Sequence, residues 1–280
     1  MTRMRSLLTV PANRADLVAK APRCAPDAVF LDLEDGVPPD AKEAARADAV
    51  DAALDLTREH PEIAVLVRVN ALTTPWFAGD VAEALTPELA GVVVPKVESA
   101  ADVDVVVDAL RSAGVGDLAI LAGLESAAGV ARAEAVLTHA AVRWCYFGAE
   151  DYVADVGGQR TTDNHEVLFA RSQVALAARL GDVWALDMIL ADFRDDERYV
   201  RDAEEGRSLG YRGKLCIHPA QVALAQRVFT PSAEAVDRAR RLLDAYAEAA
   251  ARGEATIAFE GEMVDEPMAR RARAVLDAAT

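Results

Sequence analysis

The sequence has few cysteines and lacks any long apolar run. Its three cysteines, Cys24, Cys145 and Cys216, lie far apart and form no CxxC pair. This pattern argues against a disulfide scaffold or a zinc ribbon, and it favours a reducing, cytoplasmic location. No apolar run approaches the roughly 20 residues that a membrane helix needs. The stretch before Pro11 is also too short for the apolar part of a signal peptide.

Positive charge is scarce as well. The 280 residues include 30 Lys and Arg against 46 Asp and Glu, so the net charge is −16 and the isoelectric point is near 4.7. A protein this acidic is a poor partner for nucleic acid or for an anionic membrane surface. We therefore expect small-molecule partners and no binding to either.

Several common catalytic motifs are absent. The sequence contains no P-loop, no HExxH and no GxSxG pattern, and its four histidines show no metal-ligand spacing. Residues 114–119 carry the letters of a dinucleotide-binding loop, but they precede a predicted strand, whereas such a loop follows one. The sequence gives no support for nucleotide binding or for a zinc protease.

What the sequence does contain is an alternation of short apolar runs and Ala-rich segments of helical period. Runs that are apolar throughout are typical of strands buried on both faces, as in parallel sheets. Strands that alternate with helices indicate βαβ units. The predicted strands are 6–10, 28–33, 63–69, 91–94, 118–124, 143–147, 183–189 and 214–217.

Eight such units favour a closed α/β barrel, and (β/α)8 barrels commonly use roughly 250 residues. We therefore predict a (β/α)8 TIM barrel over residues 1–230 and a C-terminal helical extension over 231–280. The extension would pack on the barrel or on a neighbouring subunit. Helical patterns cover 42–56, 102–110, 127–137 and 167–180, and Pro75, Pro87, Pro219, Pro231 and Pro267 stand where helices would begin.

Polar groups follow every predicted strand, and in a TIM barrel the C-terminal strand ends carry the chemistry. The second strand leads into Asp32, Glu34 and Asp35, the fifth into Glu125, and the sixth into Glu150 and Asp151. Carboxylate oxygens suit Mg²⁺ or Mn²⁺, whereas zinc usually takes His or Cys. Because Mg²⁺ needs only one or two protein carboxylates, Glu125 and Asp151 suffice as its ligands.

The polar residues at the strand ends can be interpreted in more than one way. Asp151 could cap the helix that follows it. Arg68 could clamp a substrate carboxylate or enolate, or it could form an ion pair with Glu34 or Asp35 at the rim. Lys96 could form a Schiff base, although pairing with carboxylates would keep its pKa high and make it a poor nucleophile.

With these residues assembled, the sequence resembles the citrate lyase β-subunit-like branch of the HpcH/HpaI aldolase family. The resemblance runs nearly end to end and keeps the order and spacing of the family's motifs. They are LTVPANRADLVAKA (7–21), FLDLEDGV (30–37), VRVN (67–70), VVPKVES (93–99), GLESAAGV (123–130), YFGAEDY (146–152), GYRGKLCIHPAQV (210–222) and EGEMVDEP (260–267).

The resemblance implies a role for particular residues. It implies Mg²⁺ held by Glu125 and Asp151, with Arg68 contacting the reacting substrate. It also implies that Glu34 and Asp35 hold metal-bound water and that Asn13 and Arg14 contact coenzyme A. Asp265 matches a residue that related enzymes lend to a neighbouring subunit's active site, so the resemblance also implies a homo-oligomer, namely a trimer.

The implied reaction is Mg²⁺-dependent carbon–carbon cleavage, or formation, of a 3-hydroxyacyl thioester of the malyl-, citramalyl- or citryl-CoA type. The products of cleavage would be acetyl-CoA and a 2-oxo acid. Three alternatives stay open. The chain could be the β subunit of a multi-component citrate lyase acting on an acyl-carrier-protein thioester. It could add hydrolysis, as a malate synthase or thioesterase does, or it could be a Schiff-base aldolase through Lys96.

Overall fold

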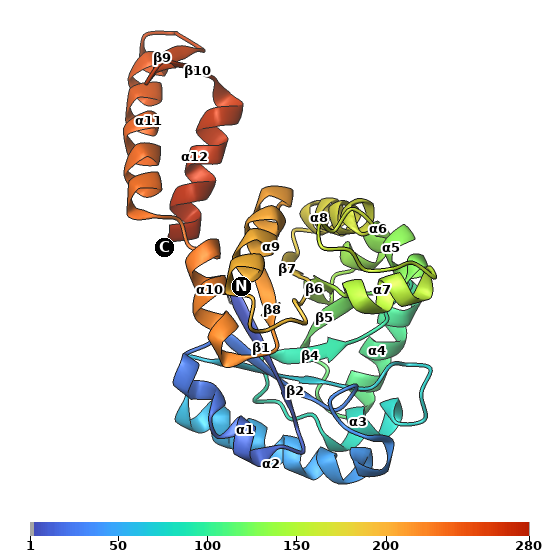
Figure 1. Ribbon diagram of the computed structural model, residues 1–280. Coiled ribbons are helices and arrows are strands. Elements are labelled where there is room, and N and C mark those ends of the chain that lie inside the picture. Colours follow the sequence, from blue (N-terminus) through green and yellow to red (C-terminus); the bar gives the residue numbers. More distant parts are fainter. Residues whose placement is uncertain (1–2, 280) are drawn as a thin grey trace. The chain divides into compact units, whose positions relative to one another are not determined.

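The computed structural model describes residues 3–279, and the chain divides into two compact units at the bond between Arg227 and Val228. The first unit is a closed barrel of eight parallel strands in chain order, encircled by helices (Figure 1). Strand β8 pairs back onto β1, with Ser6 opposite Lys214 and Leu8 opposite Cys216. The predicted (β/α)8 barrel is confirmed.

All eight predicted strands are present, with ends within a few residues of those expected. Their runs are apolar throughout because one face packs inside the barrel and the other packs against helices. The strands are β1 (Ser6–Pro11), β2 (Ala28–Asp32), β3 (Ala64–Arg68), β4 (Gly91–Val94), β5 (Ala119–Leu124), β6 (Val142–Phe147), β7 (Trp184–Asp187) and β8 (Gly213–Cys216).

The helices of this unit follow the predicted patterns with two differences. The predicted helix 127–137 is broken at Arg132 into α5 and α6, and Pro87 begins a turn before β4, so the helix expected there was wrong. The elements are α1 (Ala15–Val18), η1 (Ala21–Cys24), η2 (Pro39–Ala41), α2 (Lys42–Glu59), α3 (Phe77–Glu83), α4 (Ala100–Ser112), α5 (Ala127–Ala131), α6 (Ala133–Leu137), α7 (Ala149–Asp155), α8 (Leu168–Leu180), α9 (Asp196–Leu209) and α10 (Pro219–Phe229).

Buried apolar side chains from the strands make one cluster of the barrel unit. It includes Leu7, Phe30, Leu66, Leu121 and Tyr146, all at most 3% exposed. Burial of this much apolar surface is the main force that holds the strands together. It also gives the loops at the C-terminal strand ends a rigid base.

A second buried group is ionic and ties α8 and α9 to the barrel wall. Asp187, at the end of β7, accepts hydrogen bonds from Arg171 Nε and Nη2 at 2.8 Å each and from Lys214 Nζ at 2.9 Å. All three side chains are fully buried. Arg171 Nη2 also donates to the carbonyl oxygen of Asp202 in α9, at 2.7 Å. Burial would raise the pKa of Asp187, but the charges of Lys214 and Arg171 outweigh it and lower that pKa.

The second unit is a helical hairpin with a small two-stranded sheet. Helix α11 (Ala233–Ala251) leads to β9 (Ile257–Phe259), β10 (Glu262–Val264) and α12 (Glu266–Ala279). The predicted helical character is present, but the antiparallel β9–β10 pair was not foreseen. Glu260 and Gly261, with φ of 51° and 84°, make the two-residue turn between these strands.

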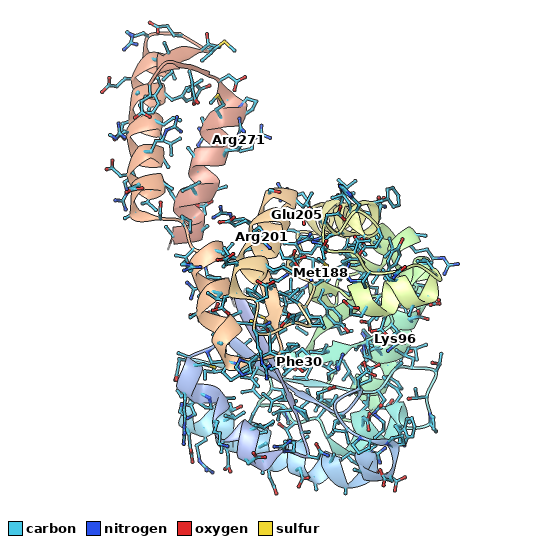
Figure 2. The ribbon with its side chains drawn as sticks, in the orientation of Figure 1. Phe30, Lys96, Met188, Arg201, Glu205 and Arg271 are labelled. Atoms are coloured by element: carbon cyan, nitrogen blue, oxygen red, sulfur yellow. The ribbon has the colours of Figure 1, made fainter. Side chains whose placement is uncertain are left out.

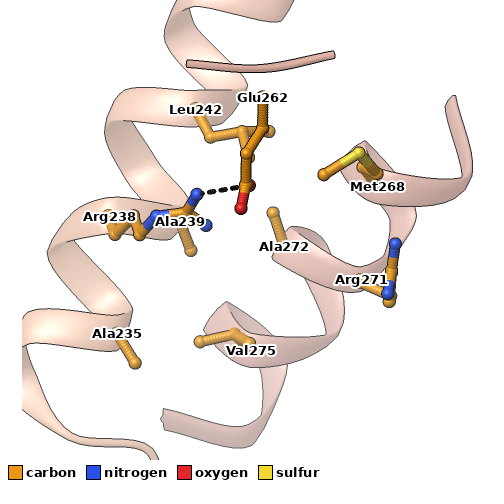
Figure 3. A pocket seen from close by; sticks show the side chains of 9 residues that line it. All are labelled: Ala235, Arg238, Ala239, Leu242, Glu262, Met268, Arg271, Ala272 and Val275. Atoms are coloured by element: carbon orange, nitrogen blue, oxygen red, sulfur yellow. Dashed lines mark hydrogen bonds and ion pairs between the residues drawn. The ribbon is translucent and has the colours of Figure 1, made fainter. Parts of the chain in front are cut away.

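A groove of about 520 Å³ lies between the two helices of this unit (Figure 3). Its apolar floor includes Leu242, Met268 and Val275, and an Arg238–Glu262 ion pair of 2.9 Å spans one side. Between residues 3 and 279, no helix combines the length and the apolar character that crossing a bilayer would require.

Candidate active site

Charged side chains from five consecutive strand ends meet at the C-terminal rim of the barrel. Asp32 is the last residue of β2 and Arg68 the last of β3, while Lys96 follows β4 by two residues. Glu125 comes directly after β5, and Asp151 lies in the first turn of α7, after β6. The barrel therefore gathers residues that are more than one hundred positions apart in the sequence.

Arg68 is held by Asp32 in a two-point ion pair. The strands pair in register with Asp32 opposite Arg68, and Arg68 Nε and Nη2 donate to Asp32 Oδ1 and Oδ2 at 2.7 and 2.8 Å. Arg68 Nη1 lies 3.1 Å from Glu34 Oε2. The ring of Phe30, labelled in Figure 2, lies 5.2 Å from the guanidinium carbon. Arg68 therefore forms an ion pair at the rim, as one of the two interpretations of the sequence expected. Its main partner is Asp32, and Glu34 is a second one.

The same Asp32 carboxylate shapes the loop after β2. It accepts the backbone N–H groups of Glu34 and Gly36, each at 2.8 Å. A Cβ atom at Gly36 would lie 2.6 Å from Asp32 Oδ2, so only glycine fits there. Lys42 Nζ also holds the loop by donating to the carbonyl oxygens of Leu33 and Glu34, at 2.9 and 2.7 Å. The LEDG segment is thus a rigid turn that presents the side chain of Glu34.

Glu34 is buried, at 6% exposure, and only one of its oxygens has a well-formed hydrogen bond. Oε1 accepts from Lys96 Nζ at 2.7 Å. Oε2 is near Arg68 Nη1, but the contact lacks hydrogen-bond geometry. Burial raises the pKa of Glu34, although the positive charges of Arg68 and Lys96 oppose this.

Glu125 is buried, and its carboxylate has backbone and hydroxyl donors but no cationic hydrogen-bond partner. Its Oε1 accepts from Lys96 N at 2.8 Å and from Tyr146 Oη at 3.0 Å. A Cβ atom at Gly148 would lie 2.3 Å from its Oε2, so that glycine makes room for the carboxylate. Burial, followed by the negative charges of Glu34 and Asp151, raises the pKa of Glu125 to about 7.

These surroundings fit a divalent cation with hard oxygen ligands. Glu34, Glu125 and Asp151 bring three carboxylates together. The positive charges of Lys96 and Arg68 offset these only in part, because Arg68 is also paired with Asp32. Over residues 3–279, no three His, Cys, Asp or Glu side chains are gathered closely enough to bind an ion by themselves. Glu125 and Asp151 stay the predicted ligands of such a cation, and Mg²⁺ commonly keeps water or substrate oxygens at its other positions.

Lys96 is poorly suited to Schiff-base chemistry. Burial would lower its pKa, but the hydrogen bond to Glu34 and the charges of Glu34, Glu125 and Asp151 outweigh this and raise the pKa of Lys96 well above its usual value. A nucleophilic lysine needs the opposite shift. The geometry therefore argues against the Schiff-base alternative.

The other predicted site residues lie elsewhere in the chain. Asn13 and Arg14 are in the loop after β1, where the Oδ1 atom of Asn13 is buried without a hydrogen-bond partner and Arg14 pairs with Asp16 at 2.8 Å. Asp35 is exposed, one residue beyond Glu34. Asp265 belongs to the second unit, where its Oδ1 accepts the N–H of Met268 at 3.3 Å and so caps α12.

Three contributions were missed at the sequence level. Asp32 as the partner of Arg68 and Tyr146 as a donor to Glu125 both depend on strand register, which the sequence does not reveal. Tyr146 lies opposite Gly123 in the β5–β6 pair, and a Cβ atom at that glycine would be 2.5 Å from the tyrosine oxygen. Lys96 was singled out, but for nucleophilic chemistry; its contacts with the carboxylates are what the structure shows.

Comparison with known proteins extends these observations. The model of the protein family described as HpcH/HpaI aldolase/citrate lyase matches residues 5–219. A citrate lyase subunit beta-like protein of Deinococcus radiodurans is 56% identical over 275 residues, covering 98% of this chain and 96% of the relative. An L-malyl-CoA/beta-methylmalyl-CoA lyase of Cereibacter sphaeroides is 35% identical over 302 residues, covering 97% and 93% of the two chains.

A solved structure is similar over nearly the full length. The protein CitE of Mycobacterium tuberculosis, in complex with magnesium, acetoacetate and coenzyme A, superposes with a TM-score of 0.82 at 33% identity. The match covers 99% of this chain and 98% of that one. The similarity therefore includes both compact units.

Proposed function

Because the chain belongs to the HpcH/HpaI aldolase/citrate lyase family, we propose that it is a Mg²⁺-dependent carbon–carbon lyase. Its substrate would be a 3-hydroxyacyl-CoA of the malyl, citramalyl or citryl type, split into acetyl-CoA and a 2-oxo acid. The observation that carries the proposal is the buried Glu125 carboxylate, beside Glu34 and Asp151 at the C-terminal rim. The names of the Cereibacter and Mycobacterium proteins support the substrate class and the metal.

Glu125 and Asp151 would hold the cation, with Mn²⁺ as an alternative to Mg²⁺. When bound, a divalent cation supplies Lewis-acid polarisation of the substrate hydroxyl and carboxylate oxygens. Glu34 and Asp35 would orient water around the cation, and Glu34 is already fixed by Lys96. Asn13 and Arg14 would contact coenzyme A from the loop after β1.

Cleavage of the C–C bond requires a base for the hydroxyl proton and stabilisation of the negative charge that forms on the thioester. The substrate hydroxyl gives its proton to a carboxylate of the cluster as its oxygen becomes the carbonyl of the 2-oxo acid. The electron pair of the breaking C–C bond passes to the thioester enolate. Arg68, held in one orientation by Asp32, would stabilise that negative charge, which is the kind of electrostatic effect that usually contributes most to catalysis.

The enolate carbon then takes up a proton to give acetyl-CoA. We assign this proton to Asp265 of a neighbouring copy of the chain, in a homotrimer. In that assembly the extension 231–280 would serve the active site of its neighbour. Because Cys24, Cys145 and Cys216 are unpaired thiols, we propose the cytoplasm as the location.

One alternative keeps the same site but changes the thioester. The name of the Deinococcus relative, citrate lyase subunit beta-like protein, supports the alternative that the chain is a citrate lyase β subunit. Its substrate would then be an acyl-carrier-protein thioester. Hydrolysis of the product thioester, as in a malate synthase or thioesterase, would add a step after cleavage. Both differ from the main proposal in products that can be measured.

A substrate panel tests the proposal. Purified protein with Mg²⁺ is given (S)-malyl-CoA, both citramalyl-CoA stereoisomers and citryl-CoA, and the products are separated by liquid chromatography. We expect equal amounts of acetyl-CoA and a 2-oxo acid from one of them. Free coenzyme A in place of acetyl-CoA would indicate added hydrolysis. No turnover of any CoA ester, with turnover of the same acyl group on a carrier protein, would favour the citrate lyase subunit.

A further inference from the structure

Lys96 contacts all three acidic side chains of the cluster through two different groups. Its backbone N–H donates to Glu125 Oε1 at 2.8 Å. Its ammonium donates to Glu34 Oε1 at 2.7 Å and lies 3.4 Å from Asp151 Oδ1. Figure 2 labels this residue on the barrel unit. Lys96 thus contacts both expected metal ligands, Glu125 and Asp151, and also the neighbouring Glu34.

The backbone at Lys96 is held in an unusual conformation to achieve this. Its φ is +53°, in the left-handed region that side chains other than glycine, asparagine and aspartate seldom adopt. The chain is fixed on both sides, since Val94 pairs with Ala122 and Val97 N donates to Gly123 O at 3.0 Å. Such strain persists only where the surrounding structure imposes it, and it concentrates at functional sites.

Lys96 and Arg68, the two cations in contact with Glu34, differ in how firmly they are held. Arg68 is 13% exposed and is tied to Asp32 at two points. The Lys96 side chain is 36% exposed and ends in a single ammonium on a flexible stem. The 3.4 Å contact with Asp151 is also the longest of its three. If one positive charge leaves the cluster, it is that of Lys96.

We propose that Lys96 is a displaceable counter-ion of the carboxylate cluster. Its ammonium contacts the Glu34 and Asp151 side chains and offsets part of the cluster's negative charge before a divalent cation binds, and it competes with that cation for Asp151. This inference rests on the proposed function, which supplies the cation. It assigns Lys96 a positioning and competing role, in which the ammonium weakens cation binding because like charges within a few ångströms repel strongly in a partly buried site.

The test is the affinity for Mg²⁺ alone, measured by titration calorimetry on the full-length protein freed of metal. Two neutral variants are compared with the unsubstituted protein: Lys96→Met, which keeps the length of the side chain, and Lys96→Asn, which suits the left-handed backbone. Lys96→Arg keeps the charge. Lys20→Met is a matched control, since Lys20 is half-exposed and pairs only loosely with Asp16, at 3.7 Å.

We expect the Kd for Mg²⁺ to fall by about tenfold or more in both neutral variants, equivalent to ~1.4 kcal/mol. The Lys96→Arg and Lys20→Met proteins should stay close to the unsubstituted value. A merely structural lysine would give the opposite result, because its loss would loosen the site and weaken binding. Thermal melts of each protein show whether the fold is kept.

Three results would overturn the inference. An unchanged or higher Kd in the neutral variants, with normal Mg²⁺ binding by the unsubstituted protein, would contradict the role of Lys96 and leave the proposed function standing. Loss of the fold in both neutral variants would show that Lys96 is needed for the barrel itself. Absence of Mg²⁺ binding by the unsubstituted protein would contradict the metal site, and with it the proposed function.

Discussion

Glu125 lies in surroundings that oppose its own charge. The side chain is 3% exposed, and both Glu34 and Asp151 add negative charge nearby. Among the described residues 3–279, Lys96 N and Tyr146 Oη donate to this carboxylate, and both reach the same oxygen. Such a carboxylate destabilises the folded chain when it is ionised, and a bound divalent cation would relieve that cost.

The first prediction follows from the raised pKa of Glu125. A carboxyl whose pKa is higher in the folded than in the unfolded chain makes the fold less stable as the pH rises from its ordinary value, 4.5, through about 7. In EDTA, Glu125→Gln should therefore be more stable than the unsubstituted protein at pH 8, by about 3 kcal/mol, and nearly equal to it near pH 5. Urea unfolding at both pH values measures this difference.

Addition of Mg²⁺ serves as the control for that prediction. The cation should stabilise the unsubstituted protein at pH 8 and have little effect on Glu125→Gln, because the variant lacks a charged ligand. If the stability difference between Glu125→Gln and the unsubstituted protein does not change with pH, the raised pKa assigned to Glu125 is wrong.

Arg68 is held in one orientation by its two-point ion pair with Asp32. Lysine cannot reproduce its two-point pairing with Asp32, so the charge would no longer be held in one orientation. We expect Arg68→Lys to lower kcat/KM by about a hundredfold or more. Mg²⁺ affinity should be nearly unchanged, since Arg68 is not an expected ligand. A variant with full kcat/KM would show that Arg68 does not act on the reacting substrate.

The elements position these residues, and the elements themselves were largely predictable. Strands buried on both faces have a continuous apolar signal, which is why all eight were found from the sequence. The β9–β10 pair was missed because two three-residue strands give almost no periodic signal. The break at Arg132 was missed because the apolar spacing continues across it.

Pairings between elements were the part that the sequence did not reveal. Glu125, Asp151, Arg68 and Glu34 were predicted from their positions after strands, and the barrel does bring them together. Which atoms meet depends on register, as in the Asp32–Arg68 and Gly123–Tyr146 pairs. The role of Asp265 stays a prediction.

The ionic group between the barrel wall and helices α8 and α9 yields a prediction about stability. Removal of one partner leaves buried charges uncompensated, so Asp187→Ala should lower the free energy of unfolding at pH 7 by about 3–5 kcal/mol. Asp108→Ala removes an exposed pair with Arg111 and should cost less than ~1 kcal/mol. Because the pKa of Asp187 is lowered, its contribution is present above its ordinary value and is lost as the pH falls through its folded value.

Equal losses in Asp187→Ala and Asp108→Ala would contradict this account of the ionic group. Chemical unfolding of the unsubstituted protein and of both variants, at pH 7 and at pH 3, gives the six values needed. The gap between the two variants should narrow at the lower pH.

The expected metal ligands, Glu125 and Asp151, belong to the barrel, and Asp265 belongs to the second unit. If Asp265 acts in the active site of a neighbouring copy, two inactive variants should complement each other. We expect Glu125→Ala and Asp265→Ala each to be inactive. After denaturation and refolding together in equal amounts, about a quarter of the sites should combine an intact Glu125 with a neighbour's intact Asp265.

Activity near one quarter of the unsubstituted level would support the shared site, and light scattering after gel filtration would show whether the assembly is a trimer. No recovery in the mixture, with full recovery of unsubstituted protein treated in the same way, would place Asp265 and Glu125 of one chain in one site. Full activity of Asp265→Ala by itself would remove Asp265 from catalysis.

We propose that the carboxylates at the C-terminal rim hold a divalent cation and that carbon–carbon cleavage requires it. The most direct measurement is the rate of 2-oxo acid release from the accepted acyl-CoA, with Mg²⁺ and with EDTA, for the unsubstituted protein and for Glu125→Ala. We predict release only by the unsubstituted protein and only with Mg²⁺. Equal release in EDTA, or by Glu125→Ala, would contradict the claim.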